Sequence, residues 1–139
     1  MQNFIIRTAI CLLIKEELGY AGTPLPLTKS QLAKILTDVT HKVFVAEQGG
    51  FVIGFVHAVH YDTLFYPPLK NIMGVAVSSK HKRMGIGKAL FACVEECARE
   101  NGAIGIRLNS GIGRPAAHAF YAACGYSELK TQKQFRKMF

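Results

Sequence analysis

The amino-acid sequence predicts a single domain of the α/β or α+β class. Segments with strand periodicity alternate with segments with helix periodicity from one end of the chain to the other. With 139 residues, half of them hydrophobic, the chain can bury one substantial core and is too short for two ordinary domains. No repeat and no linker-like segment interrupts it. We therefore expect one domain that spans residues 1–139.

The N-terminal part of the chain predicts a short strand followed by a helix. Ile5 and Ile6 open the strand. In the helix, apolar residues recur at i, i+3, i+4 and i+8, and Gly19 follows as a C-terminal signal. These apolar residues are Ile10, Leu13, Ile14 and Leu18.

A second helix is marked by start signals near Thr28. Thr28 and Gln31 have the spacing of a capping box, and Leu27 and Leu32 are placed to form a hydrophobic staple. The apolar stripe that follows consists of Leu32, Ile35, Leu36 and Val39. Two helices are thus expected before the main sheet.

Three strands are predicted in the middle of the chain. Lys42 to Glu47 and Phe51 to Tyr61 are rich in β-formers, and the glycines between them can supply the positive φ that a tight hairpin needs. After a loop that contains Pro67 and Pro68, Ile72 to Val77 forms the next strand. The longest apolar run, from Phe51 to Val59, is much shorter than the roughly 20 residues that span a bilayer, so we expect no membrane segment.

The C-terminal half predicts a helix, a strand, a helix and a final pair of strands. The first helix begins at Ile86 and is ended by Asn101-Gly102, a typical left-handed cap. Alternating apolar residues over 104–108 indicate a strand, and Arg114-Pro115 starts a helix that Gly125 ends. The last two strands are expected at Tyr126 to Leu129 and Gln134 to Met138.

Charge and cysteine usage restrict the possible partners. The formal charge is +8, but the basic residues are dispersed except around a Gly-rich turn at 80–88 and in a C-terminal group at 130–137. We interpret the C-terminal group as a solvated strand face, because runs of charge usually solubilise a protein. Lys and Arg form no continuous stripe with exposed aromatic residues, so we expect no nucleic-acid partner. The four cysteines show no metal-ligand spacing, and Cys93 and Cys97 are expected to pack in the core. Met1 to Arg7 has no secretory-signal pattern, so we expect a cytoplasmic protein.

The segment from Ser78 to Lys88 joins a predicted strand to a helix N-terminus. The first N–H groups of a helix have no internal partner, and Gly85 and Gly87 allow a phosphate to approach the backbone closely. Four basic residues can add charge-assisted contacts, namely Lys80, Lys82, Arg83 and Lys88. We favour a diphosphate ligand here over a tight turn that binds nothing. Leu90 breaks a dinucleotide fingerprint and Ala89 breaks a P-loop, so neither of those motifs is present.

Two motifs in the second half resemble those of a known family. Arg83-Met84-Gly85-Ile86-Gly87 resembles the Arg/Gln-x-x-Gly-x-Gly/Ala pyrophosphate loop of the GCN5-related N-acetyltransferases (GNAT), and Phe120 to Tyr126 resembles their Phe-Tyr-x-x-x-Gly-Phe/Tyr segment. Leu108 to Ser110 and Arg114 to His118 match a form common among bacterial members. The resemblance extends to Lys137. It implies the GNAT fold, a central mixed, mostly antiparallel sheet of six to seven strands with about four helices, splayed at the acetyl-CoA strand.

The resemblance also implies a binding site for acetyl-CoA as co-substrate, with no metal. Val75 and Val77 would bond the pantetheine arm through their main chain, with a backbone N–H near Val77 polarising the thioester carbonyl. The pyrophosphate would be bound by Arg83, Met84, Gly85, Ile86, Gly87 and Lys88. Asn109 and Arg114 would lie beside the pantetheine, and Tyr121 would contact the cofactor.

For catalysis, the resemblance assigns Tyr121 as the general acid that protonates the CoA thiolate, a role that a phenol with a pKa of ~10 can fill if the site assists. Some members carry a glutamate base where this chain has Asn71, and an amide cannot serve as one. The remaining base candidates are His60, Asp62, Glu47 and His118. Of these we prefer His60 or Asp62 acting through water, since histidine titrates in the right range.

The expected function is transfer of an acetyl group to an amine, preferably of a small molecule, by direct attack in a ternary complex. A non-catalytic acetyl-CoA sensor and the acetylation of a protein amine stay open, as does a homodimer. The acceptor should depend on the segments Tyr20 to Thr28 and Tyr61 to Lys70. The positive charge and the few acids near the expected pocket, Glu47, Asp62 and Glu128, disfavour a polycationic acceptor such as an aminoglycoside.

Overall fold

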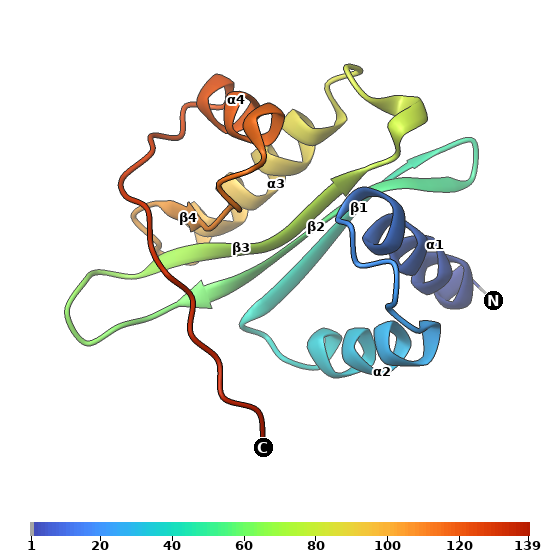
Figure 1. Ribbon diagram of the computed structural model, residues 1–139, viewed down its shortest axis with the longest axis horizontal. Coiled ribbons are helices and arrows are strands. Elements are labelled where there is room, and N and C mark those ends of the chain that lie inside the picture. The colour runs from blue at the N-terminus through green and yellow to red at the C-terminus, as the bar shows by residue number, and fades with distance from the viewer. Residues whose placement is uncertain (1) are drawn as a thin grey trace. The chain divides into compact units, whose positions relative to one another are not determined.

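Two helices precede the sheet in the computed structural model, which describes residues 2–139, with side chains from Ala9 onward. Helix α1 covers Gln2–Glu17 and α2 covers Leu25–Leu36 (Figure 1). The strand expected at Ile5 and Ile6 is therefore wrong, because these residues lie inside α1. No glycine or proline interrupts Gln2–Glu17, and extending an existing helix is far easier than starting one, so the helix continues through them.

Helix α2 begins three residues earlier than its predicted capping box. Pro24 is the N-cap and a second proline follows in the first turn, where a fixed φ suits the helix and a missing N–H costs nothing. Thr28 consequently lies within the helix and is buried, so the capping box and the hydrophobic staple are both wrong. The helix ends at Leu36, and Val39 lies outside it with 87% of its surface exposed.

The sheet has four strands in the order β1-β2-β3-β4. β1 (His41–Gln48), β2 (Phe51–Tyr61) and β3 (Leu69–Val77) are antiparallel neighbours, which confirms the three central strands. β4 (Ile106–Leu108) runs parallel to β3. Gly49 and Gly50 adopt φ of 57° and 81° in the β1–β2 hairpin, as its sequence predicted.

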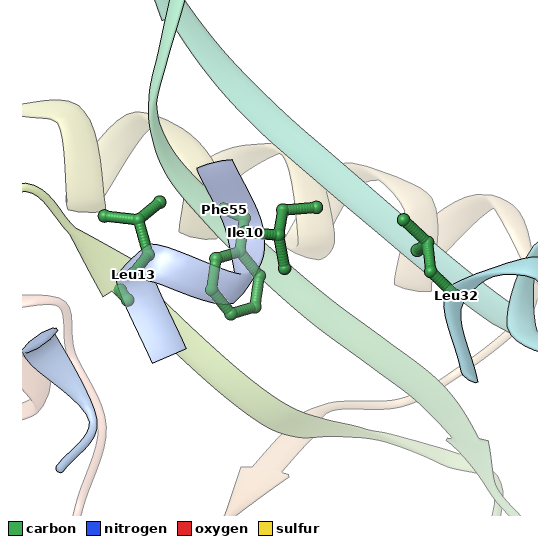
Figure 2. Close-up of a cluster of buried hydrophobic side chains, with 5 residues drawn as sticks. Ile10, Leu13, Leu32 and Phe55 are labelled. Atoms are coloured by element: carbon green, nitrogen blue, oxygen red, sulfur yellow. The ribbon is translucent and has the colours of Figure 1, made fainter. Parts of the chain in front are cut away.

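Helices cover both faces of this sheet (Figure 1). On one face, α1 and α2 pack through a buried cluster whose central residues are Ile10, Leu13, Leu32, Phe55 and Ala76 (Figure 2). On the other face lies α3 (Ile86–Glu100). Its buried residues are Leu90, Phe91, Val94, Cys97 and Ala98.

Helix α3 has the predicted start and end. Asn101 is its C-cap and Gly102 follows with φ of 75°. Cys97 packs in the core, but Cys93 is exposed, so its predicted burial is wrong. Because the buried stripe includes Phe91 and Ala98, its centre is rotated away from Cys93.

The chain divides into two units, one ending at Leu108 and one covering Asn109–Phe139. The second unit contains α4 (Pro115–Ala123), and residues 126–139 form neither helix nor strand. The final pair of strands is therefore wrong, and the described chain has four strands where six to seven were expected, together with the expected four helices. Leu129, Phe135 and Met138 are each more than three-quarters exposed, so this segment lacks the buried face that stabilises a strand.

Candidate cofactor site

The edge of β3 is open along its C-terminal half. β3 pairs with β2 along its length, but its parallel pairing with β4 covers only Lys70 to Ile72. Val75 and Val77 follow beyond the last of these pairs, on a strand whose second edge has no β4 partner there. Such an edge can accept an extended ligand as an additional strand.

The open strand leads directly into an uncapped helix N-terminus. The turn contains a short 3-10 helix, Ser79–His81, and then two left-handed residues, Arg83 with φ of 64° and Gly85 with φ of 78°. Gly85 is the N-cap of α3, and no side chain caps the helix. The first intrahelical bond runs from Ala89 N–H to the Gly85 carbonyl at 3.0 Å, which leaves the N–H groups of the first turn available to an anion.

An acidic residue from α1 fixes this turn. Glu17 Oε1 accepts the Ser79 backbone N–H at 2.9 Å, and Glu17 Oε2 lies 3.3 Å from Lys82 Nζ. Glu17 therefore neutralises part of the charge of Lys82. Lys82 is exposed, as are Lys80, Arg83 and Lys88. The sequence analysis did not identify Glu17. Its only signal is its position near the end of the first predicted helix, directly before the apolar Leu18.

A glycine in β2 allows α3 to approach the sheet beside this turn. A Cβ on Gly54 would lie 3.2 Å from the Ala76 carbonyl oxygen and 3.4 Å from side-chain atoms of Ile86 and Leu90. Gly54 pairs with Val77 in the sheet, so it supports the same end of β3 that leads into the turn. The glycine thus sets how closely the N-terminus of α3 packs on the sheet.

Two of the base candidates lie at the far end of β3 from this turn. His60 pairs with Lys70, seven residues before Val77, which corresponds to roughly 23 Å of extended strand. Asp62 follows the end of β2 and is exposed. Glu47 is exposed near the end of β1.

His60 belongs to a polar cluster around a buried lysine. Lys70 is 1% exposed, and its Nζ donates to Asn101 Oδ1 at 2.6 Å and contacts Cys97 Sγ at 3.3 Å. His60 Nε2 lies 3.4 Å from the same Asn101 oxygen. The sequence reasoning did not single out Lys70, although its alternation with the buried Ile72 placed it on the α3 face of the strand.

A histidine pair that the sequence reasoning missed lies closer to Val75. His57 pairs with Gly74 across the β2–β3 ladder, and its Nε2 lies 2.8 Å from His41 Nδ1. His41 Nε2 in turn lies 3.8 Å from the Asp38 carboxylate. Burial, and then the charge of His41, lowers the pKa of His57 from 6.5 to about 4, so its imidazole is neutral at physiological pH.

The second unit holds the remaining candidates. Arg114 is the N-cap of α4, and Tyr121 is half-buried on that helix with its ring edge-on to Phe120 at 5.8 Å. His118 Nε2 is 2.9 Å from the Gly111 carbonyl oxygen, which ties the helix to the preceding loop. Asn109 is exposed at the start of this unit.

Within the described residues, the chain has neither a cluster of metal ligands nor a membrane-spanning helix. There, no group of three His, Cys, Asp or Glu side chains is arranged to hold a metal ion. No helix in the same part of the chain is both long and apolar enough to cross a bilayer.

Comparison with known families identifies the fold. The model of the acetyltransferase (GNAT) family matches residues 9–126. The chain belongs to this family. Among GNAT sequences, N-acetyltransferase 8F1 of Rattus norvegicus is 29% identical over 124 residues, which cover 86% of this chain and 54% of the relative. N-acetyltransferase 8 of Rattus norvegicus is 32% identical over 113 residues, or 78% and 47% of the two chains.

This GNAT chain therefore spans about half the length of the curated relatives it matches. Two solved structures are similar to it in fold. Aminoglycoside N-acetyltransferase AAC(6')-Iy in complex with CoA has a TM-score of 0.85 at 21% identity, covering 94% of this chain and 88% of that one. An aminoglycoside acetyltransferase, meta-AAC0020, from an uncultured soil metagenomic sample in complex with sisomicin has a TM-score of 0.81 at 20% identity, covering 98% and 86%.

Proposed function

We propose that this GNAT chain is an acetyl-CoA-dependent N-acetyltransferase that transfers an acetyl group to an amine in a ternary complex. The observation that supports this most is the open edge of β3 leading into the uncapped N-terminus of α3. An extended pantetheine arm suits such an edge, and a diphosphate suits such a terminus. The bound CoA of a structural relative of the same fold is consistent with this proposal.

In the first unit, both backbone groups and charged side chains would contact acetyl-CoA. Val75 and Val77 would bond the pantetheine amides through their main chain. Gly85 and the first N–H groups of α3 would hold the pyrophosphate, with Arg83 and Lys88 adding charge-assisted contacts. Met84, Ile86 and Gly87 belong to the same turn and are also proposed to contact the pyrophosphate. In the second unit, Asn109 and Arg114 are proposed to contact the pantetheine.

The transfer itself requires two proton movements. The neutral amine nitrogen attacks the thioester carbon, the new C–N bond forms, and the C–S bond breaks to release the CoA thiolate. Tyr121 is proposed to donate the proton that converts this thiolate to CoA thiol. The proton lost by the amine must go to a base.

His57 is a stronger base candidate on geometry than His60 or Asp62. It pairs with Gly74, the residue before Val75, whereas His60 pairs with Lys70. His57 is neutral at physiological pH and can accept a proton, but its lowered pKa of about 4 makes it a weak base. His60 and Asp62 could act only through water over a longer distance. A pH–rate profile that changes in His57→Gln and not in His60→Gln would support this assignment.

One observation favours a second function, a non-catalytic acetyl-CoA sensor. Asn71 stands where some GNAT members carry a glutamate base, and its Oδ1 accepts a hydrogen bond from Arg107 Nη1 at 2.5 Å. Position 71 therefore serves the structure and supplies no base. A sensor would bind acetyl-CoA without releasing CoA.

The test combines a binding and a turnover measurement. Calorimetry should show one acetyl-CoA bound per chain, and a thiol assay with a panel of small amines and a basic peptide should show CoA release above background. Binding without release for any amine would favour the sensor. Absence of binding would contradict both functions.

A further inference from the structure

A pocket lies beneath the two N-terminal helices, and its wall includes His57, the proposed base. It has a volume of about 210 Å³ and is lined by side chains of α1, α2, the loop between them, β1 and β2. Figure 2 shows Leu32 on α2 set apart from Ile10 and Phe55, and all three line the pocket. None of the residues proposed to bind acetyl-CoA belongs to its wall.

The chemistry of the wall selects for an apolar, uncharged molecule. Most of the lining side chains are aliphatic or aromatic, and no Asp, Glu, Lys or Arg is among them. The polar lining side chains are Thr23, Thr28, Gln31 and His57. A cation would lose its hydration here with no carboxylate to replace it.

Thr28 supplies an unsatisfied hydrogen-bonding group. The residue is 7% exposed, and its Oγ1 is buried without a hydrogen-bond partner. Thr28 lines the pocket, so its hydroxyl lies beside the space that a bound molecule would occupy. A bound molecule with one polar group would satisfy it.

The volume sets the size of the molecule. An engineered apolar cavity of about 150 Å³ holds benzene, so a pocket of about 210 Å³ has room for a single ring with a short substituent. The pocket has an entrance, because Leu27 and Gln31 on its rim are exposed. We propose that this pocket binds a small neutral molecule, a monocyclic aromatic or a branched aliphatic of similar size, with one hydroxyl-type group that bonds Thr28. This inference does not depend on the proposed acetyltransferase activity.

Calorimetric titration of the full chain with benzyl alcohol, toluene and benzylammonium tests the proposal. Benzyl alcohol and toluene should each bind at one site, and benzylammonium should not bind detectably. Thr28→Val should weaken benzyl alcohol about three- to tenfold, the effect of one hydrogen bond, and leave toluene unchanged. Ile35→Phe, which fills the pocket, should abolish both.

Absence of benzyl alcohol and toluene binding, or unchanged affinity in Ile35→Phe, would overturn the proposal. If Ile35→Phe fails to fold, the Thr28→Val comparison decides alone, and equal benzyl alcohol affinity in wild type and Thr28→Val would overturn the hydroxyl assignment. Thr28→Val should also raise the melting temperature of the ligand-free chain, because it removes a buried unpartnered hydroxyl.

Two roles of this pocket can be distinguished: it binds the apolar end of the acceptor amine, or it binds a separate ligand. An extended cofactor beyond β3 would lie about 10 Å from β2, two strand spacings, so an acceptor with its ring in the pocket needs a chain of several atoms. CoA release with 4-phenylbutylamine, inhibited competitively by benzyl alcohol, would support the site as the place for the apolar end of the acceptor. Benzyl alcohol binding without such release would support it as a site for a separate ligand.

Discussion

Acidification should destabilise this protein through His57, and the lowered pKa of this half-buried side chain sets how much unfolding free energy is lost. The pKa of His57 is lowered from 6.5 to about 4, chiefly by burial and then by the charge of His41. Between these values the unfolded chain binds a proton at His57 and the folded chain does not. The stabilisation is therefore fully present above pH 6.5 and is lost as the pH falls toward 4.

The magnitude follows from the pKa difference. A shift of about 2.5 pKa units corresponds to at most about 3.4 kcal/mol of unfolding free energy. Because His57 is only half-buried, solvent screening reduces this to roughly 1–2 kcal/mol. At pH 5 most of the unfolded-state protonation is complete, so a loss of about 1 kcal/mol is expected there.

Urea denaturation at pH 7.5 and pH 5.0 measures this loss in wild type and in His57→Gln. The other histidines are present in both proteins, so the difference between the two pH dependences isolates His57 and its contact with His41. His118→Gln, in the second unit, is a matched control for the loss of an imidazole elsewhere in the chain. If wild type and His57→Gln lose the same free energy between the two pH values, the reasoning about His57 is refuted.

Substitutions at Lys70, Gly54 and Tyr121 test other parts of the structure. Lys70→Ala should cost about 2–4 kcal/mol of unfolding free energy because it leaves a cavity and removes the Asn101 contact. Lys70→Met should cost less because it keeps the packing without a buried charge. Equal losses of unfolding free energy in the two variants, measured by urea denaturation, would count against this. Gly54→Val should cost about 1–3 kcal/mol of unfolding free energy by overpacking against α3, and it should weaken acetyl-CoA binding in calorimetry. The control Gly22→Val should show neither effect, because a Cβ on Gly22 would have no neighbouring atom within 4 Å. Tyr121→Phe should reduce CoA release about 10²–10⁴-fold with little change in acetyl-CoA affinity; wild-type turnover would show that Tyr121 is a packing residue.

The sequence predicted the centre of the fold well because the signals there are local. Glycines at 49 and 50 set the hairpin, and Asn101-Gly102 ends α3, as their backbone conformations require. The motif between Ser78 and Lys88 was likewise visible as a strand-to-helix turn. Its partner Glu17 was not, because the contact spans 62 residues of sequence.

The errors occurred where tertiary packing or competing local signals decide. Thr28 fits a capping box, but Pro24 starts α2 earlier and places Thr28 inside the helix. The alternating residues of 126–139 fit strands, yet a strand also needs a partner, which sequence periodicity does not supply. His57 was noted only as an interruption of the apolar run from Phe51 to Val59. Its importance depends on a side-chain contact with His41, although its backbone partner across the hairpin is Val43.

The central claim is that acetyl-CoA binds at the open edge of β3 and the N-terminus of α3. The most direct test is thermal denaturation of wild type, Gly87→Asp and the equally charged control Gly22→Asp, each with and without acetyl-CoA. Acetyl-CoA at about 100 times its dissociation constant should add about 2.7 kcal/mol to wild type and to Gly22→Asp. Gly87→Asp should fold and gain nothing, because its carboxylate would meet the pyrophosphate at short range. Full stabilisation of Gly87→Asp by acetyl-CoA would contradict the claim.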